Sequence, residues 1–182
     1  MRIISGNSRG TKLETLEGIT TRPTLDRVKE SLFSIIQAHI QEAYVLDLFG
    51  GSGALALESL SRGAEFAVIC DNSRKACNII EENIEKTKQI DRVRLYNLDY
   101  KKCLNKLKEE NITFDIIFID PPYKSKLYEI VIQQIIELKL LKEDGIIILE
   151  TDDKNIKTGQ GVGVYDMREY GNVNLIFLNR KG

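Results

Sequence analysis

Short apolar stretches alternate with longer, polar-faced stretches along the chain, beginning near residue 44. The short stretches have the length and β-branched content of strands buried on both faces, and the longer ones repeat apolar residues at helical spacing. This alternation predicts an α/β fold with a doubly wound, mostly parallel sheet. The predicted parallel strands are Tyr44–Phe49, Phe66–Cys70, Val93–Asn97, Phe114–Asp120 and Gly145–Leu149. The predicted helices are Ala54–Arg62, Ser73–Lys88, Lys101–Glu110 and Leu127–Leu138.

The pattern changes after the fifth strand. Two further apolar segments, Gly163–Arg168 and Val173–Asn179, are separated only by Glu169–Asn172, which is too short for a helix. Consecutive strands joined by so few residues must run antiparallel. We therefore expect a seven-stranded sheet that has helices on both faces and ends in an antiparallel hairpin.

The segment before the sheet is organised differently. Arg2–Ser5 and Thr11–Leu16 flank a basic turn that contains two glycines, which predicts a small hairpin. A helix over Leu25–Gln37 follows, with Thr24 as its predicted N-cap and Asp26 in its first turn. We expect one domain over residues 1–182, with a hairpin extension at 1–20 and a core at 21–182.

Charge and hydropathy restrict where the protein acts. The 26 basic and 27 acidic residues give a formal charge of -1, so the molecule as a whole is not a generic polyanion binder. Residues 1–29, however, carry six basic against three acidic side chains. No apolar run approaches the roughly 18 residues of a membrane span, and the N-terminus lacks a signal-peptide core. These features predict a cytoplasmic protein with a local basic surface and no membrane partner.

The potential soft metal ligands are few. Cys70, Cys77 and Cys103 form no C-x-x-C pair, and only His39 could join them. We expect no metal site, free thiols of the kind that suits a reducing compartment, and a structural role for His39.

A glycine-rich turn follows the first predicted strand. Gly51 and Gly53 lie between that strand and the next helix, a corner where such folds bind ligands. With Ala56 they also match the dinucleotide pattern G-x-G-x-x-G/A. Asp47 at the strand end would repel a pyrophosphate but would attract the ammonium of an amino-acid ligand. S-adenosylmethionine carries such an ammonium, so the turn predicts this cofactor, although glycines in a tight turn have the same pattern.

Two more acids follow strands. Asp71 ends the second strand, where its carboxylate can accept hydrogen bonds from both ribose hydroxyls of the cofactor. Asp99 follows the third strand and can accept from the adenine amine while Leu98 packs on the ring. For Asp71 the alternative is a cap on the next helix, and for Asp99 a purely structural role is nearly as well supported.

The fourth strand ends in Asp120-Pro121-Pro122-Tyr123. The prolines fix the backbone and remove two donors, which leaves the Asp120 carboxylate and the Pro121 carbonyl as rigid acceptors. Exocyclic amines of nucleobases are weak nucleophiles, so an enzyme must activate them by positioning. Asp120 and Pro121 could hold such an amine, and Tyr123 could stack on a flipped or single-stranded base.

The motifs together resemble the bacterial small-subunit rRNA methyltransferases that modify guanine N2 in 16S rRNA. The specific part of the resemblance is N-terminal: Arg2–Gly6, then Arg9-Gly10-x-Lys12-Leu13, and Arg22-Pro23-Thr24 with Asp26–Phe33. Asp47-Leu48-Phe49-x-Gly51-x-Gly53 and Asp120–Tyr123 are shared with many amino-methyltransferases. The chain departs from the family at Cys70–Ser73, where a more charged stretch is usual, but Asp71 is retained.

The resemblance implies a Rossmann-like class I methyltransferase that acts on 16S rRNA in an assembled or assembling small ribosomal subunit. We expect a monomer, because the sequence shows no exposed apolar stripe that would demand a partner. The resemblance also implies that the following residues bind S-adenosylmethionine: Asp47, Phe49, Gly51, Gly53, Asp71, Asn72, Leu98 and Asp99. It implies catalytic roles for Asp120, Pro121, Pro122 and Tyr123. It implies RNA contacts through Arg9, Lys12, Arg22, Thr24 and Arg27.

Three other functions are compatible with parts of the sequence. An adenine-N6 methyltransferase would use the same Asp120 and Pro121, but the DNA enzymes need a recognition domain that 182 residues cannot hold. A glutamine methyltransferase would carry Asn in place of Asp120. A cofactor-binding assembly factor without catalysis would not need the whole Asp120–Tyr123 motif.

Overall fold

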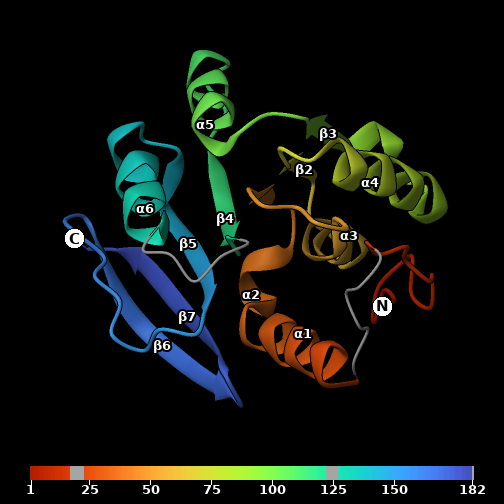
Figure 1. Ribbon diagram of the computed structural model, residues 1–182, viewed down its shortest axis with the longest axis horizontal. Coiled ribbons are helices and arrows are strands. Elements are labelled where there is room, and N and C mark those ends of the chain that lie inside the picture. The colour runs from red at the N-terminus through yellow and green to blue at the C-terminus, as the bar shows by residue number, and fades with distance from the viewer. Residues whose placement is uncertain (17–22, 122–126, 182) are drawn as a thin grey trace.

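The computed structural model describes residues 1–16, 23–121 and 127–181, with only the backbone at 23–25. Seven strands form one sheet in the order β3-β2-β1-β4-β5-β7-β6 (Figure 1). β1 to β5 are parallel, and β7 runs antiparallel to both β5 and β6. The predicted sheet and its terminal hairpin are therefore confirmed. The strands are β1 (Tyr44–Asp47), β2 (Phe66–Cys70), β3 (Val93–Tyr96), β4 (Phe114–Ile119), β5 (Leu141–Thr151), β6 (Val162–Tyr170) and β7 (Val173–Arg180).

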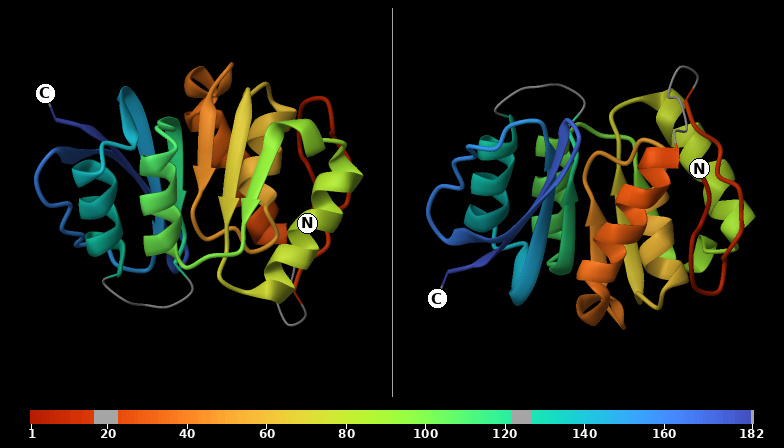
Figure 2. Two further views of the ribbon diagram at one scale, coloured as in Figure 1. Left: turned by 90° about the horizontal axis from the view of Figure 1, so that it is seen from above. Right: turned by 90° about the horizontal axis from the view of Figure 1, so that it is seen from below.

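Helices cover both faces of the sheet (Figure 2). They are α1 (Pro23–Ile35), α2 (Gln37–Ile40), α3 (Ala54–Ser61), α4 (Arg74–Thr87), α5 (Tyr100–Glu109) and α6 (Leu127–Glu137). The four helices α1, α2, α3 and α4 pack on one face of the sheet and share one hydrophobic core. Helices α5 and α6 pack on the other face, around a second core. In β1, Val45 belongs to the first core and Leu46 to the second, because successive strand residues point to opposite faces. Among the described helices, none has both the length and the apolar character that a bilayer crossing requires.

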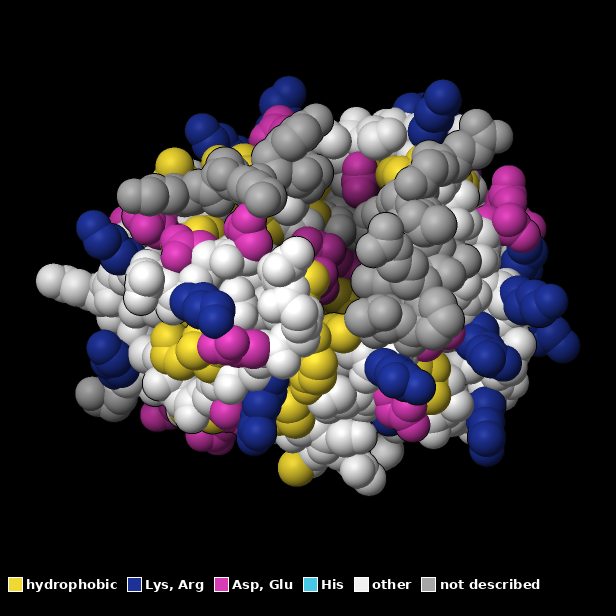
Figure 3. All heavy atoms as spheres, turned by 60° about the horizontal axis from the view of Figure 1, so that its bottom comes forward, with side chains coloured by type: hydrophobic (Ala, Val, Ile, Leu, Met, Phe, Trp, Pro, Cys, Tyr) yellow, Lys and Arg dark blue, Asp and Glu magenta, His cyan; other side chains and the backbone are white. Residues whose placement is uncertain are grey.

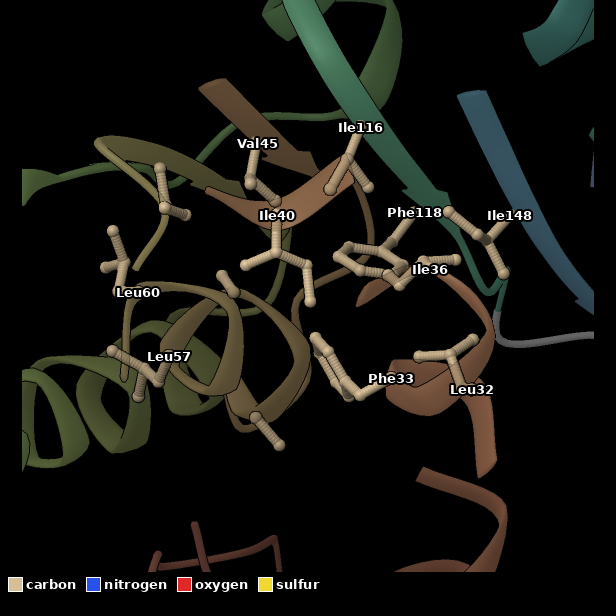
Figure 4. Packing of buried hydrophobic residues seen from close by; sticks show 14 of the residues in the cluster. Leu32, Phe33, Ile36, Ile40, Val45, Leu57, Leu60, Ile116, Phe118 and Ile148 are labelled. Atoms are coloured by element: carbon tan, nitrogen blue, oxygen red, sulfur yellow. The ribbon is translucent and has the colours of Figure 1, made fainter. Parts of the chain in front are cut away.

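The first core places α1 over β4 and β5. Phe33 from α1 and Phe118 from β4 lie with ring centroids 6.1 Å apart, and Leu32, Ile36 and Ile148 pack beside them (Figure 4). Phe33 is fully buried, as is usual for the large aromatic residues at the centre of a core. This packing holds α1 beside the carboxyl ends of the strands, where the candidate site lies.

Most element boundaries differ from the sequence prediction by no more than two residues, and two elements differ further. β5 begins at Leu141 rather than Gly145. Leu141 pairs with Phe114 of β4, and a register shift separates this pair from the rest of the ladder. The strand therefore includes the polar residues between Leu141 and Gly145. The helix predicted over Leu25–Gln37 is two helices, interrupted at Ile36. The first helix begins at Pro23. Proline is tolerated there because the N–H group that it lacks would have no acceptor within the first turn of the helix. Thr24 therefore lies inside the helix, and its prediction as N-cap was wrong.

The N-terminal hairpin exists, but without regular strands. Its arms meet at one antiparallel bridge, Arg2 to Lys12, and three backbone hydrogen bonds flank that bridge. Several other backbone groups of the hairpin bond to side chains of the core: Glu58 of α3 accepts from the N–H groups of Ile4 and Ser5 at 2.9 and 3.0 Å. Asn83 of α4 bonds both the N–H and the C=O of Glu14. The hairpin is thus attached to helices rather than to a sheet edge.

Candidate active site

The carboxyl ends of β1, β4 and β5 open into a cavity of about 240 Å³. Figure 3 shows a hollowed face with acidic and hydrophobic side chains near its centre. β1 and β4 are neighbours in the sheet although they are distant in sequence, so this is the point where the strand order reverses. Ligands of doubly wound sheets bind at such a point. The cavity is lined by Met1, Thr15, Leu16, Val28, Lys29, Leu32, Asp47, Phe49, Gly50, Gly51, Ser52, Ala54, Leu55, Phe118, Ile119, Asp120, Ile148, Glu150 and Leu175.

The glycine turn after β1 forms one wall of the cavity. Gly51 and Gly53 have φ values of 59° and 76°, a region that glycine enters without a steric penalty. A Cβ on Gly51 would meet no atom within 4 Å, so its outer face is open to a ligand. Gly53 precedes the first residue of α3 and lies against Ile69 and Ile80. One glycine leaves room for a ligand, and the other brings helix and sheet together.

Asp47, the last residue of β1, is 3% exposed, and its Oδ2 has no hydrogen-bond partner among the described residues. Desolvation raises the pKa of Asp47 to about 7, with a further rise from Asp71 and an opposing effect of the Ala56 backbone N–H. A buried carboxylate without a partner is costly unless a ligand satisfies it. An ammonium group is the chemical match.

Asp71 holds the glycine turn to β2. Its carboxylate accepts from the Gly51 N–H at 3.0 Å and from the Ser73 N–H at 2.9 Å, so it braces both the turn and the start of α4. Each carboxylate oxygen has a further lone pair for a ribose hydroxyl. Asn72 beside it is exposed. The structure thus shows Asp71 bound to the start of α4, as the alternative reading of the sequence had it, and its cofactor role stays a prediction.

The predicted adenine contacts lie farther along the same sheet edge. The Asp99 carboxylate caps α5 by accepting from the N–H groups of Lys101 and Lys102 at 2.9 and 3.1 Å. The structural role that the sequence left open for Asp99 is therefore present. Leu98 is half-buried beside the second core. Phe49, which lines the cavity, lies with its ring centroid 6.0 Å from that of Tyr100.

Asp120 follows the last residue of β4 directly and lines the cavity together with Asp47. It retains exposed surface, while surrounding protein atoms desolvate its carboxylate. This desolvation, with the charges of Glu150 and Asp47, raises the pKa of Asp120 well above its usual range. Pro121 is half-buried. Pro122 and Tyr123 lie outside the described residues, so their predicted roles remain predictions.

Glu150, near the end of β5, lines the same cavity, and sequence reasoning missed it. Burial raises the pKa of its carboxyl group. The available signal was its position directly after the apolar run Gly145–Leu149, the same strand-end position that identified Asp47 and Asp120. The cavity thus contains three carboxylates, from three adjacent strands.

The predicted RNA-contacting residues fall at the hairpin and the start of α1. Arg9, Lys12 and Arg27 are exposed. Arg9 and Arg27 line a second, shallow cavity together with Arg2, and two acids, Asp26 and Glu30, also line it. Arg22 and the Thr24 side chain lie outside what the structure describes.

Known proteins resemble this chain along most of its length. A model of the family described as Conserved hypothetical protein 95 matches residues 1–179. The Ribosomal RNA small subunit methyltransferase D of Haemophilus influenzae is 35% identical over 163 residues, which cover 87% of this chain and 82% of that protein. The chain belongs to the ribosomal RNA small subunit methyltransferase D family.

Two more proteins align with the full length of this chain. YlbH of Bacillus subtilis, provisionally named an rRNA methyltransferase, is 35% identical over 185 residues and covers 100% of both chains. The structure of YhhF of Escherichia coli, provisionally assigned as a methyltransferase, superposes with a TM-score of 0.86 at 27% identity. That match covers 100% of this chain and 98% of the other. The likeness to methyltransferases in sequence and in fold therefore runs along the full length of the alignments.

The residues at this sheet edge fit S-adenosylmethionine, the cofactor that the sequence predicted for this methyltransferase. The unpartnered Oδ2 of Asp47 matches its ammonium, the open face of Gly51 leaves space, and Asp71 offers acceptors for its ribose. Within the described residues, no group of three or more His, Cys, Asp or Glu could hold a metal ion. Cys70, Cys77 and Cys103 are free and buried.

Proposed function

We propose that this methyltransferase transfers a methyl group to the exocyclic N2 amine of a guanine in 16S rRNA of the small ribosomal subunit. The observation that carries the proposal is the shared cavity of Asp47, Gly51 and Asp120 at the point where the strand order reverses. The names of its relatives, which are small-subunit rRNA methyltransferases, support the class of substrate.

The cofactor would be held by the turn after β1 and by the acids that follow β1 and β2. When bound, S-adenosylmethionine supplies an electrophilic methyl group. Asp47 would pair with its ammonium and Asp71 with its ribose, while Phe49 and Leu98 offer apolar surface. The apolar side chains of α1 that line the cavity, Val28 and Leu32, would exclude water from the reacting atoms.

Asp120 and Pro121 would orient the amine. Its nitrogen is a weak nucleophile, because its lone pair is delocalised into the ring. If the Asp120 carboxylate and the Pro121 carbonyl each accept one N–H, the lone pair can turn toward the methyl group. After transfer the nitrogen must lose one proton. The Asp120 carboxylate, whose pKa is raised by desolvation, is placed to receive it.

The substrate base must leave its helix to reach a cavity at the sheet edge. We expect an unpaired or flipped guanine, because a stacked base cannot present its amine in this way. The exposed Arg9, Lys12 and Arg27 would contact phosphates next to the target, which positions the RNA without reading its sequence. Because the net charge is only -1, a preformed rRNA surface suits this local contact better than extended RNA.

Asp120→Asn tests the proposed chemistry. The amide removes the negative charge and the proton acceptor but retains the shape, so we expect kcat to fall about 100- to 1,000-fold. Labelled methyl transfer to unmodified small subunits measures it, with subunit affinity and cofactor affinity unchanged. Asp144→Asn, an exposed acid on β5, is the matched control.

Near-normal turnover in Asp120→Asn would contradict the assigned role of Asp120. If even the wild-type protein binds subunits and cofactor without transferring label, it is a non-catalytic assembly factor instead.

A further inference from the structure

Glu150 lies beside Asp120 at the carboxyl edge of the sheet. Ile119 of β4 pairs with Leu149 of β5, so Asp120 and Glu150 are the next residues on two adjacent parallel strands. Two residues earlier, Phe118 and Ile148 share one face of the sheet and one core. Alternation along a strand places Asp120 and Glu150 on that same face, and both line the cavity.

Nothing in the described protein satisfies the Glu150 carboxylate. It takes part in no ion pair and no side-chain hydrogen bond among the described residues, although its surroundings desolvate it. Lys29, which lines the same cavity, donates instead to the Arg2 carbonyl at 2.6 Å and pairs with Glu58 at 3.2 Å. A half-buried carboxylate that lines the cavity and has no partner among the described residues is free to accept a hydrogen bond from a ligand there.

A base bound in the cavity would need a hydrogen-bond donor for Glu150 next to the amine that Asp120 holds. On guanine, the N1–H lies beside the N2 amine on the same edge of the ring, so two adjacent carboxylates would meet two adjacent donors. Adenine has an unprotonated acceptor nitrogen at N1, and it would face the Glu150 oxygen with repulsion. Flipped bases are commonly read through this edge.

We propose that Glu150 is the residue that selects guanine, by accepting a hydrogen bond from N1–H while Asp120 and Pro121 hold the N2 amine. This inference rests on the proposed function, because it needs guanine N2 to be the acceptor. It assigns the two acids different tasks: Asp120 contacts the reacting nitrogen, and Glu150 positions the base and rejects those without an N1 proton.

The test compares guanine with 2-aminopurine, which retains the 2-amino group but has an unprotonated N1. Small subunits are reconstituted with either base at the mapped target position, and kcat/KM is measured for both. For the wild-type protein we expect 2-aminopurine to be methylated about 10- to 100-fold less efficiently, because an acceptor then faces a carboxylate.

Glu150→Gln should reverse this preference in part. The amide can rotate to donate to the bare N1, so its kcat/KM on 2-aminopurine should rise at least about fivefold above wild type while that on guanine falls. Glu150→Asp retains the charge and should keep the preference for guanine at a lower rate. Glu143→Gln, an exposed acid on the same strand, should behave as wild type.

The outcomes separate the two proposals. If wild type methylates guanine N2 but treats both bases alike, or if Glu150→Gln keeps the wild-type preference with cofactor affinity and thermal stability intact, the role of Glu150 is wrong and the proposed function stands. If wild type leaves guanine N2 unmodified, the proposed function itself fails. Glu150→Asp carries the test should Glu150→Gln not fold, since loss of the guanine preference in Glu150→Asp would contradict the proposal.

Discussion

Single carboxylates at strand ends dominate the chemistry of this protein. Asp47 has no partner for one oxygen in the cofactor-free protein, and desolvation raises its pKa to about 7. A cationic ligand favours the ionised form, so binding below that pH must first remove a proton. The affinity for S-adenosylmethionine should therefore increase as pH rises through about 7.

Isothermal titration between pH 5.5 and 8.5 measures this dependence. Below the pKa we expect the wild-type affinity to fall by up to about tenfold per pH unit, whereas Asp47→Asn should bind weakly and with little change in this range. A wild-type affinity that is flat across pH 7 would show that Asp47 does not meet the ammonium.

The same shift affects stability in the opposite direction. Because the folded pKa of Asp47 lies above its unfolded value of 3.8, its favourable contribution is complete below pH 3.8 and is lost as pH rises through about 7. Asp47→Asn should thus stabilise the cofactor-free protein at pH 8, by at most about 4 kcal/mol. The ionised Asp47 therefore lowers the stability of the folded protein but increases its affinity for the cofactor, as is common at ligand sites.

For individual residues, the sequence predicted where acidic side chains lie but not which groups they bind. Asp47, Asp71 and Asp120 were predicted because each lies at the end of an apolar strand, and the structure brings Asp47 and Asp120 into one cavity. Glu150 obeys the same rule but lacks a neighbouring Gly or Pro motif that would draw attention to it. Asp99 shows that a strand-end acid also makes a good helix cap, and its predicted contact with adenine stays a prediction.

Among the elements, the N-terminal hairpin depends most on a single side chain. Glu58 of α3 is 0% exposed and binds the N–H groups of Ile4 and Ser5 as well as Lys29 and Arg62. Two cations and two backbone donors thus share one carboxylate. It fastens the hairpin that carries Arg9 to the core.

Glu58→Gln should release this attachment. It leaves the buried Lys29 without its counter-ion, and we expect a loss of about 3–5 kcal/mol in the free energy of unfolding. The amide hydrogens of Ile4 and Ser5 should exchange with solvent faster than in wild type. Glu65→Gln, an exposed acid nearby, is the control, and equal exchange in the two variants would contradict the role of Glu58.

Element boundaries were predictable where the local signals agreed. Ser73 caps α4 and Lys88 ends it, close to the predicted bounds, because cap and apolar face coincide. β5 was predicted too short because its first residues are polar, and their pairing with β4 depends on tertiary contacts that periodicity does not show. The hairpin arms were predicted as strands, but Glu58 and Asn83 take the backbone groups that a ladder would need.

For the whole molecule, the chain order of the strands determines where the chemistry lies. The sheet order brings β1 beside β4, so the glycine turn and the Asp120-Pro121 segment meet although about 70 residues separate them. The alternation of strands and helices predicts that both segments lie at the carboxyl edge of one sheet, and the observed strand order makes them neighbours. This explains why the sequence could predict the location of the site better than its full set of residues.

Nucleoside analysis tests most directly whether this site methylates guanine N2. Small subunits that lack the modification are incubated with the protein and methyl-labelled S-adenosylmethionine, and the rRNA is digested to nucleosides. We predict that the label appears in N2-methylguanosine and that Asp120→Asn slows its appearance about 100- to 1,000-fold. Label in N6-methyladenosine would contradict the proposed function and identify an adenine-N6 methyltransferase.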